Sequence, residues 1–541
     1  MCKRIFISLL MLSMLSGAAL SQRYSSFSNY LIFPSTITQT EPVMCISPLN
    51  PQILFVSAVT IKLGTSLLKS EGVYFSTNGG INWIGIDSCT GQSTANHGGS
   101  PGVAINNIGV FVLTHNGLFI PGAYGHFSTD FGTTWSNAAT IISSQTDDKC
   151  VSPTTADYDP TSPYYGRIYH ARVVFTSPFP VDFSYTTNGG VSWIPSFAIN
   201  NSPPQRCSGA YVKTGLDGKV YVCWAGVAPT SPFPENFIGL AVSTNGGDNW
   251  SVNQNIYAVN GINGTLPSKG SIRVNGLPNL GIDKSNGPRR GWMYIATTEQ
   301  NLAPAGSDPD IILHYSSNNG TSWSSGIRVN QDPMNNGKIQ YFPSIDVDTT
   351  GAINILYYDD RNTSSDSAEV YLSRSKDGGS TWTEFLVSNH RFKPKPIPGG
   401  AAGYQGDHIT LESSGNKLYA LWMDDFSGLY QVWLAPIDIS TIGIRNITTQ
   451  IPDKFNLQQN YPNPFNPVTK IKFDIASHSV GQTFLSVYDI TGREISTLVN
   501  ENLQAGSYEV TFDGSNIPSG IYFYRLKSGN YIETKRMVLV K

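Results

Sequence analysis

Apolar and polar residues follow one another along most of the chain in short runs that predict strands, grouped in pairs around a turn. The clearest pair is Pro343 to Asp348 and Ala352 to Tyr358, with a turn between them. An apolar run, a turn bearing Gly or Asn, and a second run with period-two alternation indicate a β-hairpin. We count seven such hairpins, with second strands beginning near Gln52, Gly109, Gly166, Gly218, Gly291, Gly351 and Gly415. The pattern predicts an all-β protein.

A recurring octapeptide follows six of these hairpins. Its pattern is Ser/Thr-x-Asn/Asp-x-Gly-x-x-Trp, and it first runs from Ser76 to Trp83. The hydroxyl and carboxamide side chains can bond to nearby backbone, glycine supplies a positive φ, and the Trp offers a large apolar surface. The start-to-start spacings of 52, 58, 57, 73 and 59 residues are those of four-stranded blades in a radial repeat. The copies begin at Ser76, Ser128, Thr186, Ser243, Ser316 and Ser375.

These octapeptides resemble the Asp-box, or bacterial neuraminidase repeat, of the sialidase superfamily. The resemblance implies a β-propeller over residues 22–440. It gives a structural role in the turns to Asn78, Asp130, Asn188, Asn245, Asn318 and Asp377. It implies little about activity, because a fold does not fix a function.

The number of blades follows from the hairpins rather than from the octapeptides. Residues 31–33 lie where an outer strand should precede the first hairpin. We therefore predict seven blades, with the N-terminal strand completing the last one and leaving no open edge. Six blades is the alternative, if one hairpin is an insertion.

After a polar linker at residues 441–452, short alternating strands and turns from 453 to 541 predict a small Ig-like β-sandwich. The order of its motifs, from Phe455–Pro467 through Val487–Arg493 to Lys535–Lys541, resembles the type A C-terminal sorting domain of the type IX secretion system. The resemblance implies export across the outer membrane of a bacterium, the secretion machinery as a partner, and a secreted or surface location.

The N-terminus has the features of a cleaved secretory signal over residues 1–21. Lys3 and Arg4 precede an apolar run from Ile5 to Leu15, which is too short to cross a bilayer, and small residues follow it. No other segment approaches 18 consecutive apolar residues, so we expect no transmembrane segment after cleavage. A net charge of −3 with 13% charged residues gives no case for nucleic-acid binding. We expect a monomer.

Five cysteines remain after signal cleavage, and this odd number leaves at least one thiol unpaired. A Cys207–Cys223 bridge is one interpretation, because both residues fall on adjacent strands of one blade. Buried free thiols are the other. No cysteine or histidine spacing typical of zinc occurs, so no metal site is predicted.

The strand order limits where a ligand could bind. In a four-stranded meander the octapeptide turns share one face with the turns between first and second strands. Ligand groups are therefore expected on the opposite face, in the loops after second strands and before first strands. Two of these loops are alike, because each begins with paired carboxylates, Asp359 with Asp360 and Asp424 with Asp425. A further pair, Asp407 and His408, leads into the first strand of the last blade. These loops carry Tyr358, Asp359, Asp360, Arg361, Trp422, Asp424, Asp425, Asp407 and His408.

Two functions fit this set of side chains. Tyr358, Arg361, Trp422, Asp407 and His408 suit sugar binding, whereas Asp359, Asp360, Asp424 and Asp425 are candidates for a glycosidase acid/base pair. Capping of strand ends by aspartate is the alternative. Calcium (Ca²⁺) is suggested only by the crowding of Asp359, Asp360 and Asp366, without an Asp-x-Asp-x-Asp-Gly loop. No other cofactor is expected.

The sialidase comparison does not extend to catalysis. Catalytic members use three arginines to hold the substrate carboxylate, the first in an Arg-Ile-Pro motif before the first box. This chain has no Arg-Ile-Pro, and only Arg4 and Arg23 precede Ser76. The leading hypothesis is therefore a propeller that binds extracellular glycan or protein. An exo-acting glycoside hydrolase is the alternative, so enzyme activity stays open, and a structural adhesin is the third.

Overall fold

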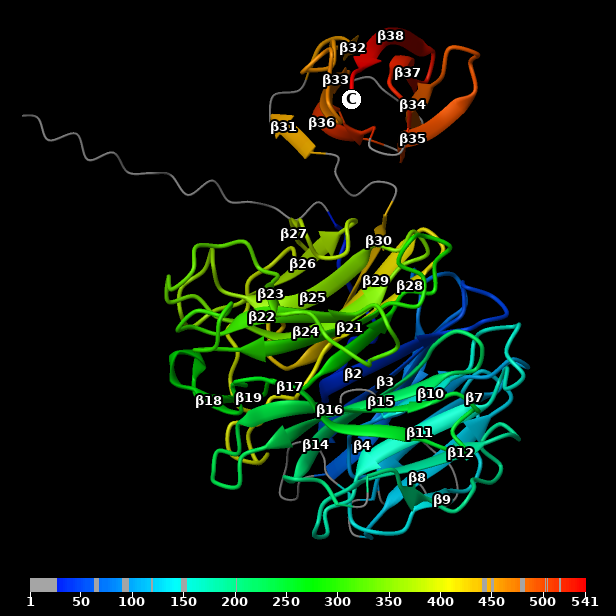
Figure 1. Ribbon diagram of the computed structural model, residues 1–541, viewed down its shortest axis with the longest axis vertical. Coiled ribbons are helices and arrows are strands. Elements are labelled where there is room, and N and C mark those ends of the chain that lie inside the picture. The colour runs from blue at the N-terminus through cyan, green and yellow to red at the C-terminus, as the bar shows by residue number, and fades with distance from the viewer. Residues whose placement is uncertain are drawn as a thin grey trace, which may run out of the picture.

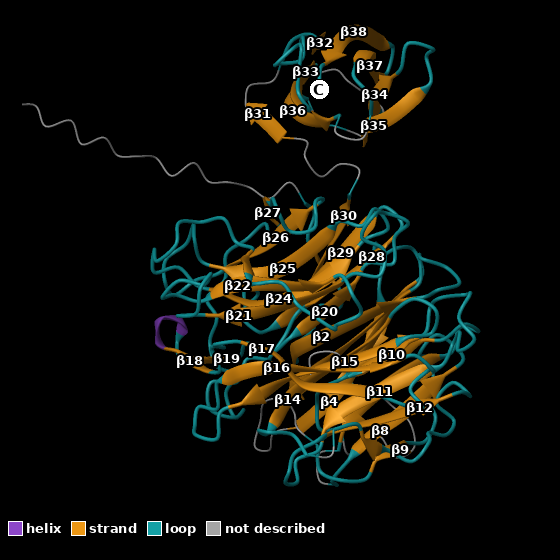
Figure 2. Cartoon of the chain, in the orientation of Figure 1, coloured by secondary structure: helices purple, strands orange, loops and turns teal. Residues whose placement is uncertain are grey.

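The computed structural model describes residues 27–62, 68–89, 97–117, 120–146, 153–200, 202–439, 445–448, 452–476, 482–501, 503, 505–514 and 517–541. Nearly all regular structure in these ranges is strand, and the single 3-10 turn η1 (Pro267–Lys269) is drawn purple in Figure 2. No described helix has the length and apolarity to span a membrane. The predicted signal at residues 1–21 lies outside the described residues.

Seven four-stranded antiparallel sheets follow one another from residue 30 to residue 438 (Figure 1). Their strands are β2 Thr38–Ile46, β3 Leu54–Lys62, β4 Leu68–Ser76 and β5 Ile84–Ile86; β6 Gly102–Ile105, β7 Phe111–Asn116, β8 Ala123–Ser128 and β9 Ala139–Ile142; β10 Thr154–Ala156, β11 Ile168–Val173, β12 Val181–Thr186 and β13 Phe197–Ala198; β14 Cys207–Thr214, β15 Val220–Val227, β16 Glu235–Ser243 and β17 Ser251–Ala258; β20 Asn279–Ile282, β21 Met293–Glu299, β22 Asp310–Ser316 and β23 Ile327–Arg328; β24 Gln340–Val347, β25 Ile353–Asp359, β26 Glu369–Ser375 and β27 Thr383–Leu386; and β28 Thr410–Ser414, β29 Lys417–Asp424, β30 Gln431–Asp438 and β1 Tyr30–Leu31.

The sheets close into a ring. The first strand of each sheet contacts the first strand of the next, from β2 through β6, β10, β14, β20 and β24 to β28, which contacts β2 again. The N-terminal strand β1 pairs with β30, with Tyr30 opposite Leu434 and Leu31 opposite Trp433. This is a seven-bladed propeller whose last blade is completed by the N-terminus, as the hairpin pattern predicted.

In the octapeptide turns the Ser/Thr hydroxyl and the Asn/Asp side chain accept the same two backbone N–H groups, as seen between β16 and β17. The Ser243 hydroxyl oxygen accepts the backbone N–H of Gly247 at 2.8 Å, and Asn245 Oδ1 accepts that of Asn249 at 2.9 Å. Trp250 donates from Nε1 to the Gly247 carbonyl at 3.0 Å, and its ring lies 4.7 Å from that of Phe183 in the neighbouring sheet. The turn therefore closes a hairpin and anchors it to the adjacent blade.

Ser243→Ala tests the contribution of this turn to stability. The buried Gly247 N–H loses its acceptor, so we expect a loss of about 1–3 kcal/mol in the free energy of unfolding. Urea unfolding measures the change. Ser251→Ala, at an exposed position on β17, is the control and should leave the midpoint nearly unchanged. Equal midpoints for the two variants would contradict this role of the turn.

The predicted Cys207–Cys223 bridge is wrong. Both side chains are buried free thiols, as are Cys45 and Cys89. The register of β14 and β15 explains the error, because Cys223 lies opposite Tyr211 while Cys207 lies opposite Gly226. The two cysteines are therefore offset along adjacent strands. Cys150 lies outside the described residues.

One insertion interrupts the repeat between β17 and β20. It forms a hairpin of β18 (Gly264–Leu266) and β19 (Ile272–Val274), joined through η1. Ile272 and Val274 are buried in the same apolar cluster as Phe392, Ile397 and other residues of the segment before β28. The hairpin thus covers one end of the neighbouring blades.

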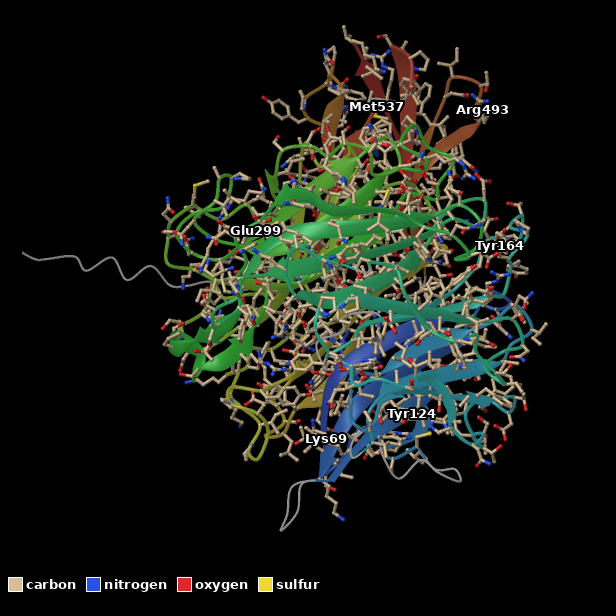
Figure 3. The ribbon with its side chains drawn as sticks, turned by 60° about the horizontal axis from the view of Figure 1, so that its bottom comes forward. Lys69, Tyr124, Tyr164, Glu299, Arg493 and Met537 are labelled. Atoms are coloured by element: carbon tan, nitrogen blue, oxygen red, sulfur yellow. The ribbon has the colours of Figure 1, made fainter. Side chains whose placement is uncertain are left out.

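The C-terminal part is a β-sandwich, as predicted. Its two four-stranded sheets share one apolar core that includes Phe473, Leu485, Tyr524 and Met537, of which Met537 is labelled in Figure 3. The sheets are β31 (Arg445–Thr448), β36 (Gly506–Asp513), β33 (Val468–Ile475) and β32 (Asn456–Leu457), and β35 (Glu494–Glu501), β34 (Thr483–Tyr488), β37 (Gly520–Ser528) and β38 (Tyr531–Leu539).

Candidate functional site

The residues predicted to bind a ligand lie where β25 and β29 end and where β28 is about to begin, but their side chains are buried. Tyr358 is 1% exposed and Trp422 is 0% exposed, so neither ring offers a platform to solvent. Asp407 and His408 are each 2% exposed. These residues are buried because two segments of the chain, which the strand pattern did not predict to pack here, lie over them.

Two segments form this cover: the β18–β19 hairpin and residues 389–408. The backbone N–H of Arg273 donates to the Gly403 carbonyl at 2.6 Å, which joins the two segments. Tyr404 is buried in the same apolar cluster as Tyr358 and Trp422, and its ring centroid lies 5.6 Å from Nζ of Lys69, which Figure 3 labels. The central channel of the propeller, which the first strands of the seven sheets surround, is therefore packed with side chains at this end.

Asp360 forms an ion pair with Lys269. The two side chains are 0% exposed, and Lys269 Nζ lies 2.7 Å from Asp360 Oδ2. The other carboxylate oxygen accepts the backbone N–H of Ile339 at 2.7 Å. Lys269 also donates to the carbonyls of Ser365 and Ser367, and burial lowers its pKa. Both carboxylate oxygens of Asp360 are therefore engaged within the protein.

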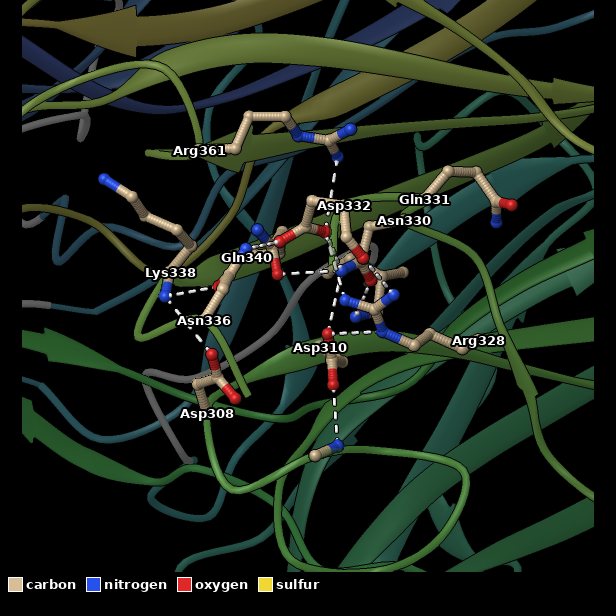
Figure 4. A network of polar contacts seen from close by, with 12 residues as sticks. Asp308, Asp310, Arg328, Asn330, Gln331, Asp332, Asn336, Lys338, Gln340 and Arg361 are labelled. Carbon is tan, nitrogen blue, oxygen red and sulfur yellow. Dashed lines mark hydrogen bonds and ion pairs between the residues drawn. The ribbon is translucent and has the colours of Figure 1, made fainter. Parts of the chain in front are cut away.

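Asp359 is held by Arg361. Its Oδ1 accepts the Arg361 backbone N–H at 2.6 Å in an Asx-turn, and its Oδ2 accepts Nε–H at 2.7 Å. Burial raises the pKa of Asp359 to about 6, although Arg361 opposes the shift. Figure 4 shows Arg361 reaching toward Asp332, 3.9 Å away, and Glu384 accepts from the same guanidinium at 2.9 Å. Arg361 is thus engaged by carboxylates and presents no open cation.

The second carboxylate pair is also engaged. Asp424 Oδ2 accepts Nε1–H of Trp422 at 2.7 Å and lies 2.8 Å from His390 Nε2, while Oδ1 accepts the backbone N–H of Phe426 at 3.0 Å. Asp425 lies 2.9 Å from Lys395 Nζ, and burial raises its pKa. The aspartates at the ends of β25 and β29 thus form Asx-turns and ion pairs, as expected if they cap the strand ends.

Asp407 and His408 differ from each other in their surroundings. Asp407 accepts from Arg273 Nε at 3.1 Å and also from its terminal nitrogen. His408 has no hydrogen-bond partner on either ring nitrogen among the described residues, and burial lowers its pKa to about 3. His408 is therefore a neutral imidazole packed in the core.

A polar cavity lies at the other end of the central channel, on the face of the octapeptide turns. Its volume is about 500 Å³, and the first strands of all seven sheets contribute to its wall. A volume of 300–1,000 Å³ is usual for small-ligand sites. Its polar lining includes Ser47, Thr155, Lys213, Thr214, Lys284, Ser285, Asn286, Asp346, Glu412 and Ser413.

Charged groups in this cavity are unevenly paired. Lys213 Nζ lies 3.5 Å from both Asp346 Oδ1 and Glu412 Oε1. Lys284 forms no ion pair among the described residues, and its Nζ donates to Thr214 Oγ1 at 3.4 Å. Burial, and then Lys213, lower the pKa of Lys284 to about 8, whereas burial raises the pKa of Glu412. Perturbed groups in a cavity mark a candidate functional site.

The sequence pattern did not predict these residues, because the expected ligand loops lie on the opposite face. A signal was present in the sequence, since Lys213, Asp346 and Glu412 interrupt the apolar pattern of first strands. The pattern also did not predict the cluster of His97, His115 and His126, whose ring nitrogens lie close together.

Comparisons with known proteins identify the C-terminal part. Residues 459–541 match the family model described as a secretion system C-terminal sorting domain. A search of curated protein sequences found no match.

Solved structures with similar architecture include a protein of unknown function from Dyadobacter fermentans, 10% identical, covering 77% of this chain and 98% of that one, with a TM-score of 0.43. An ulvan lyase of a polysaccharide lyase family is 11% identical, with 76% and 96% covered and a TM-score of 0.48. The α-L-arabinofuranosidase Arb93A of Fusarium graminearum is 12% identical, with 63% and 93% covered and a TM-score of 0.38. None of these likenesses carries an activity or a site residue over to this chain.

The two parts of the chain indicate its architecture and its route of export. The type IX secretion machinery recognises such a domain, and the protein that bears it is delivered to the outer-membrane surface or the medium. This chain is a seven-bladed β-propeller joined to a C-terminal sorting domain of the type IX secretion system.

Proposed function

We propose that the propeller binds an acidic extracellular glycan in the channel cavity on its octapeptide face, without cleaving it. The observation that carries the proposal is Lys284, a cation in a cavity of about 500 Å³ with no ion-pair partner among the described residues. A carboxylate or sulfate on a sugar would supply that partner. The hydroxyl and amide groups of Ser47, Ser285 and Asn286 suit sugar hydroxyls.

The size of the cavity favours a glycan over a folded protein as the ligand. Stable protein interfaces bury about 800 Å² on each partner, whereas this cavity is a concave pocket enclosed by strands of seven sheets. Export by the type IX system also brings the propeller into contact with extracellular polymers.

The test uses the full chain, immobilised and offered a panel of neutral, sialylated, uronate-bearing and sulfated polysaccharides. We expect the wild type to retain at least one acidic polysaccharide and no neutral one. Lys284→Ala should no longer retain the acidic polysaccharide. Lys417→Ala, at a second-strand position outside the cavity lining, is the control and should retain the glycan. Retention that is unchanged in Lys284→Ala would contradict the proposed site.

Binding should weaken as the pH rises. The Lys284 ammonium is charged below its pKa of about 8 and loses its charge above it, so an anionic ligand is held best at lower pH. Glu412, whose pKa is raised, becomes negatively charged at a lower pH than that at which Lys284 loses its charge. The Glu412 carboxylate then repels the anionic ligand. We therefore expect stronger retention at pH 6 than at pH 9. Lys284→Arg keeps its charge and should flatten this dependence, and an unchanged profile would argue against Lys284.

Proton-transfer chemistry at the same cavity is the second candidate. The raised pKa of Glu412 and the lowered pKa of Lys284 are properties that general acids and bases need. Asp359, Asp360, Asp424 and Asp425 are less suited, since internal groups engage each of them. Release of sugar fragments from a retained polysaccharide, abolished in Glu412→Gln, would replace the binding role with this one.

A further inference from the structure

Three buried histidines converge beside the first two blades, away from the channel cavity. His115 on β7 and His126 on β8 are diagonal neighbours on one face of the sheet, since His126 pairs with Leu113 and His115 pairs with Tyr124. His97 forms a bridge with Gly117 and brings the third ring to the same place. The three side chains are 1%, 2% and 0% exposed for His97, His115 and His126. Tyr124, labelled in Figure 3, lies beside them with its ring centroid 6.0 Å from that of His115.

The hydrogen bonds of His115 and His126 fix which ring nitrogen carries the proton. Nδ1 of His115 lies 2.7 Å from the Asn116 carbonyl, and Nδ1 of His126 lies 2.9 Å from the Ser136 carbonyl. A carbonyl oxygen only accepts, so each Nδ1 donates and each neutral ring has a bare Nε2.

The two bare nitrogens face each other. Nε2 of His115 lies 3.0 Å from Nε2 of His126. Two lone pairs at this distance repel unless a proton or a cation lies between them. His97 adds a third ring. Its Nδ1 lies 2.5 Å from a carboxylate oxygen of Glu71, and neither of its ring nitrogens has an aligned hydrogen-bond partner among the described residues.

Glu71 and the two carbonyls complete the surroundings expected of metal ligands. A metal-binding histidine almost always donates its other ring nitrogen to a carboxylate or a backbone carbonyl, and all three rings have such a neighbour here. Glu71 is itself 0% exposed, and its other oxygen accepts the backbone N–H of Gly99 at 2.8 Å. It would supply negative charge to balance a cation.

The distances suit a small transition-metal ion. Zn–N bonds of about 2.0–2.1 Å place two ligands of a tetrahedral ion roughly 3.4 Å apart. The His115–His126 separation of 3.0 Å is close to that value, and one ligand atom from each of the three rings lies within 4.8 Å of the others. The His97 ring is stacked on that of His115, with centroids 3.8 Å apart, so it would have to leave this stack to reach the ion. Imidazole donors favour zinc, copper or nickel over calcium or magnesium, which take oxygen ligands.

We propose that His97, His115 and His126 bind one transition-metal ion of the zinc type, with Glu71 orienting His97. The ion ties β7 and β8 of the second blade to the segment that enters this blade and, through Glu71, to β4 of the first. Three histidines leave the fourth position of a tetrahedral ion open. The ligands are buried and lie apart from the channel cavity, so the ion has no part in binding there.

The experiment measures metal in the full chain, produced without a histidine tag and incubated with Zn²⁺ before extensive dialysis. We expect about one zinc ion per chain in the wild type, because three histidine nitrogens are enough to hold one zinc ion. His126→Gln should lose the ion, and Glu71→Gln should weaken affinity by about 10–100-fold. His314→Gln is the matched control, because His314 makes the same Nδ1 contact with a serine carbonyl, at 2.9 Å from Ser324, but stacks on Tyr257.

A Co²⁺-loaded wild type provides a readout that needs no variant. Visible absorption typical of tetrahedral cobalt supports the site even if His126→Gln fails to fold. Zinc at the same low level in the wild type and His126→Gln, together with a cobalt spectrum like that of the free aqueous ion, overturns the proposal. The histidine pair would then share a proton whose charge Glu71 balances.

Discussion

Replacing Lys269 with methionine should destabilise the propeller by about 3–5 kcal/mol, because it leaves the Asp360 carboxylate buried without its cation. Lys269 and Asp360 are both 0% exposed and lie 2.7 Å apart. The carbonyls of Ser365 and Ser367 lose a donor at the same time. Urea unfolding of the full chain measures the effect as a shift in midpoint.

The control for this prediction is an ion pair of similar length on the surface. Lys393 lies 2.8 Å from Asp366, with the two side chains 73% and 49% exposed. Lys393→Met should leave the midpoint nearly unchanged, because water solvates the remaining carboxylate. Adding Asp360→Asn to Lys269→Met should recover part of the lost stability. Equal midpoints for Lys269→Met and Lys393→Met would contradict the burial argument.

Removal of the sorting domain should abolish export. A chain ending at residue 452 lacks the matched residues 459–541 and gives the type IX machinery nothing to recognise. In a bacterium with this system we expect the truncated chain to stay in the periplasm, whereas the full chain reaches the surface or the medium. Cell fractionation and immunoblotting measure the distribution.

A second experiment tests whether the sorting domain is sufficient for export, independently of the folding of the propeller. Residues 441–541 fused to an unrelated periplasmic protein should carry that protein out of the cell. A truncated chain found outside the cell in the same proportion as the full chain would contradict the assignment of the sorting role.

Much of the fold could be predicted from the sequence because hairpins are local. Each observed second strand begins two residues after the predicted position, as with Leu54 after Gln52 and Ile353 after Gly351. The turn residues fix these starts, since the glycines there adopt positive φ, for example 78° at Gly351. The outer strand before the first hairpin, predicted at residues 31–33, is observed at Tyr30–Leu31 and overlaps the prediction.

The surroundings of the predicted site residues could not be predicted in the same way. Lys269 is separated from Asp360 by 91 residues, and nothing in either local pattern indicates that they meet. The cover over Tyr358 and Trp422 comes from a hairpin insertion and a long irregular segment, whose packing depends on tertiary contacts. The histidine cluster has no motif spacing. It forms because the register of β7 and β8 and the bridge at His97 bring separate strands together.

The central claim, that the channel cavity is where a glycan binds, is tested most directly by acetylation of lysines read out by mass spectrometry. The protein is labelled alone and in the presence of the polysaccharide that it retains. We predict that Lys284 is protected by the polysaccharide while Lys393, at 73% exposure on another surface, is labelled equally in both samples. Equal labelling of Lys284 with and without the retained polysaccharide would place binding elsewhere and contradict the account.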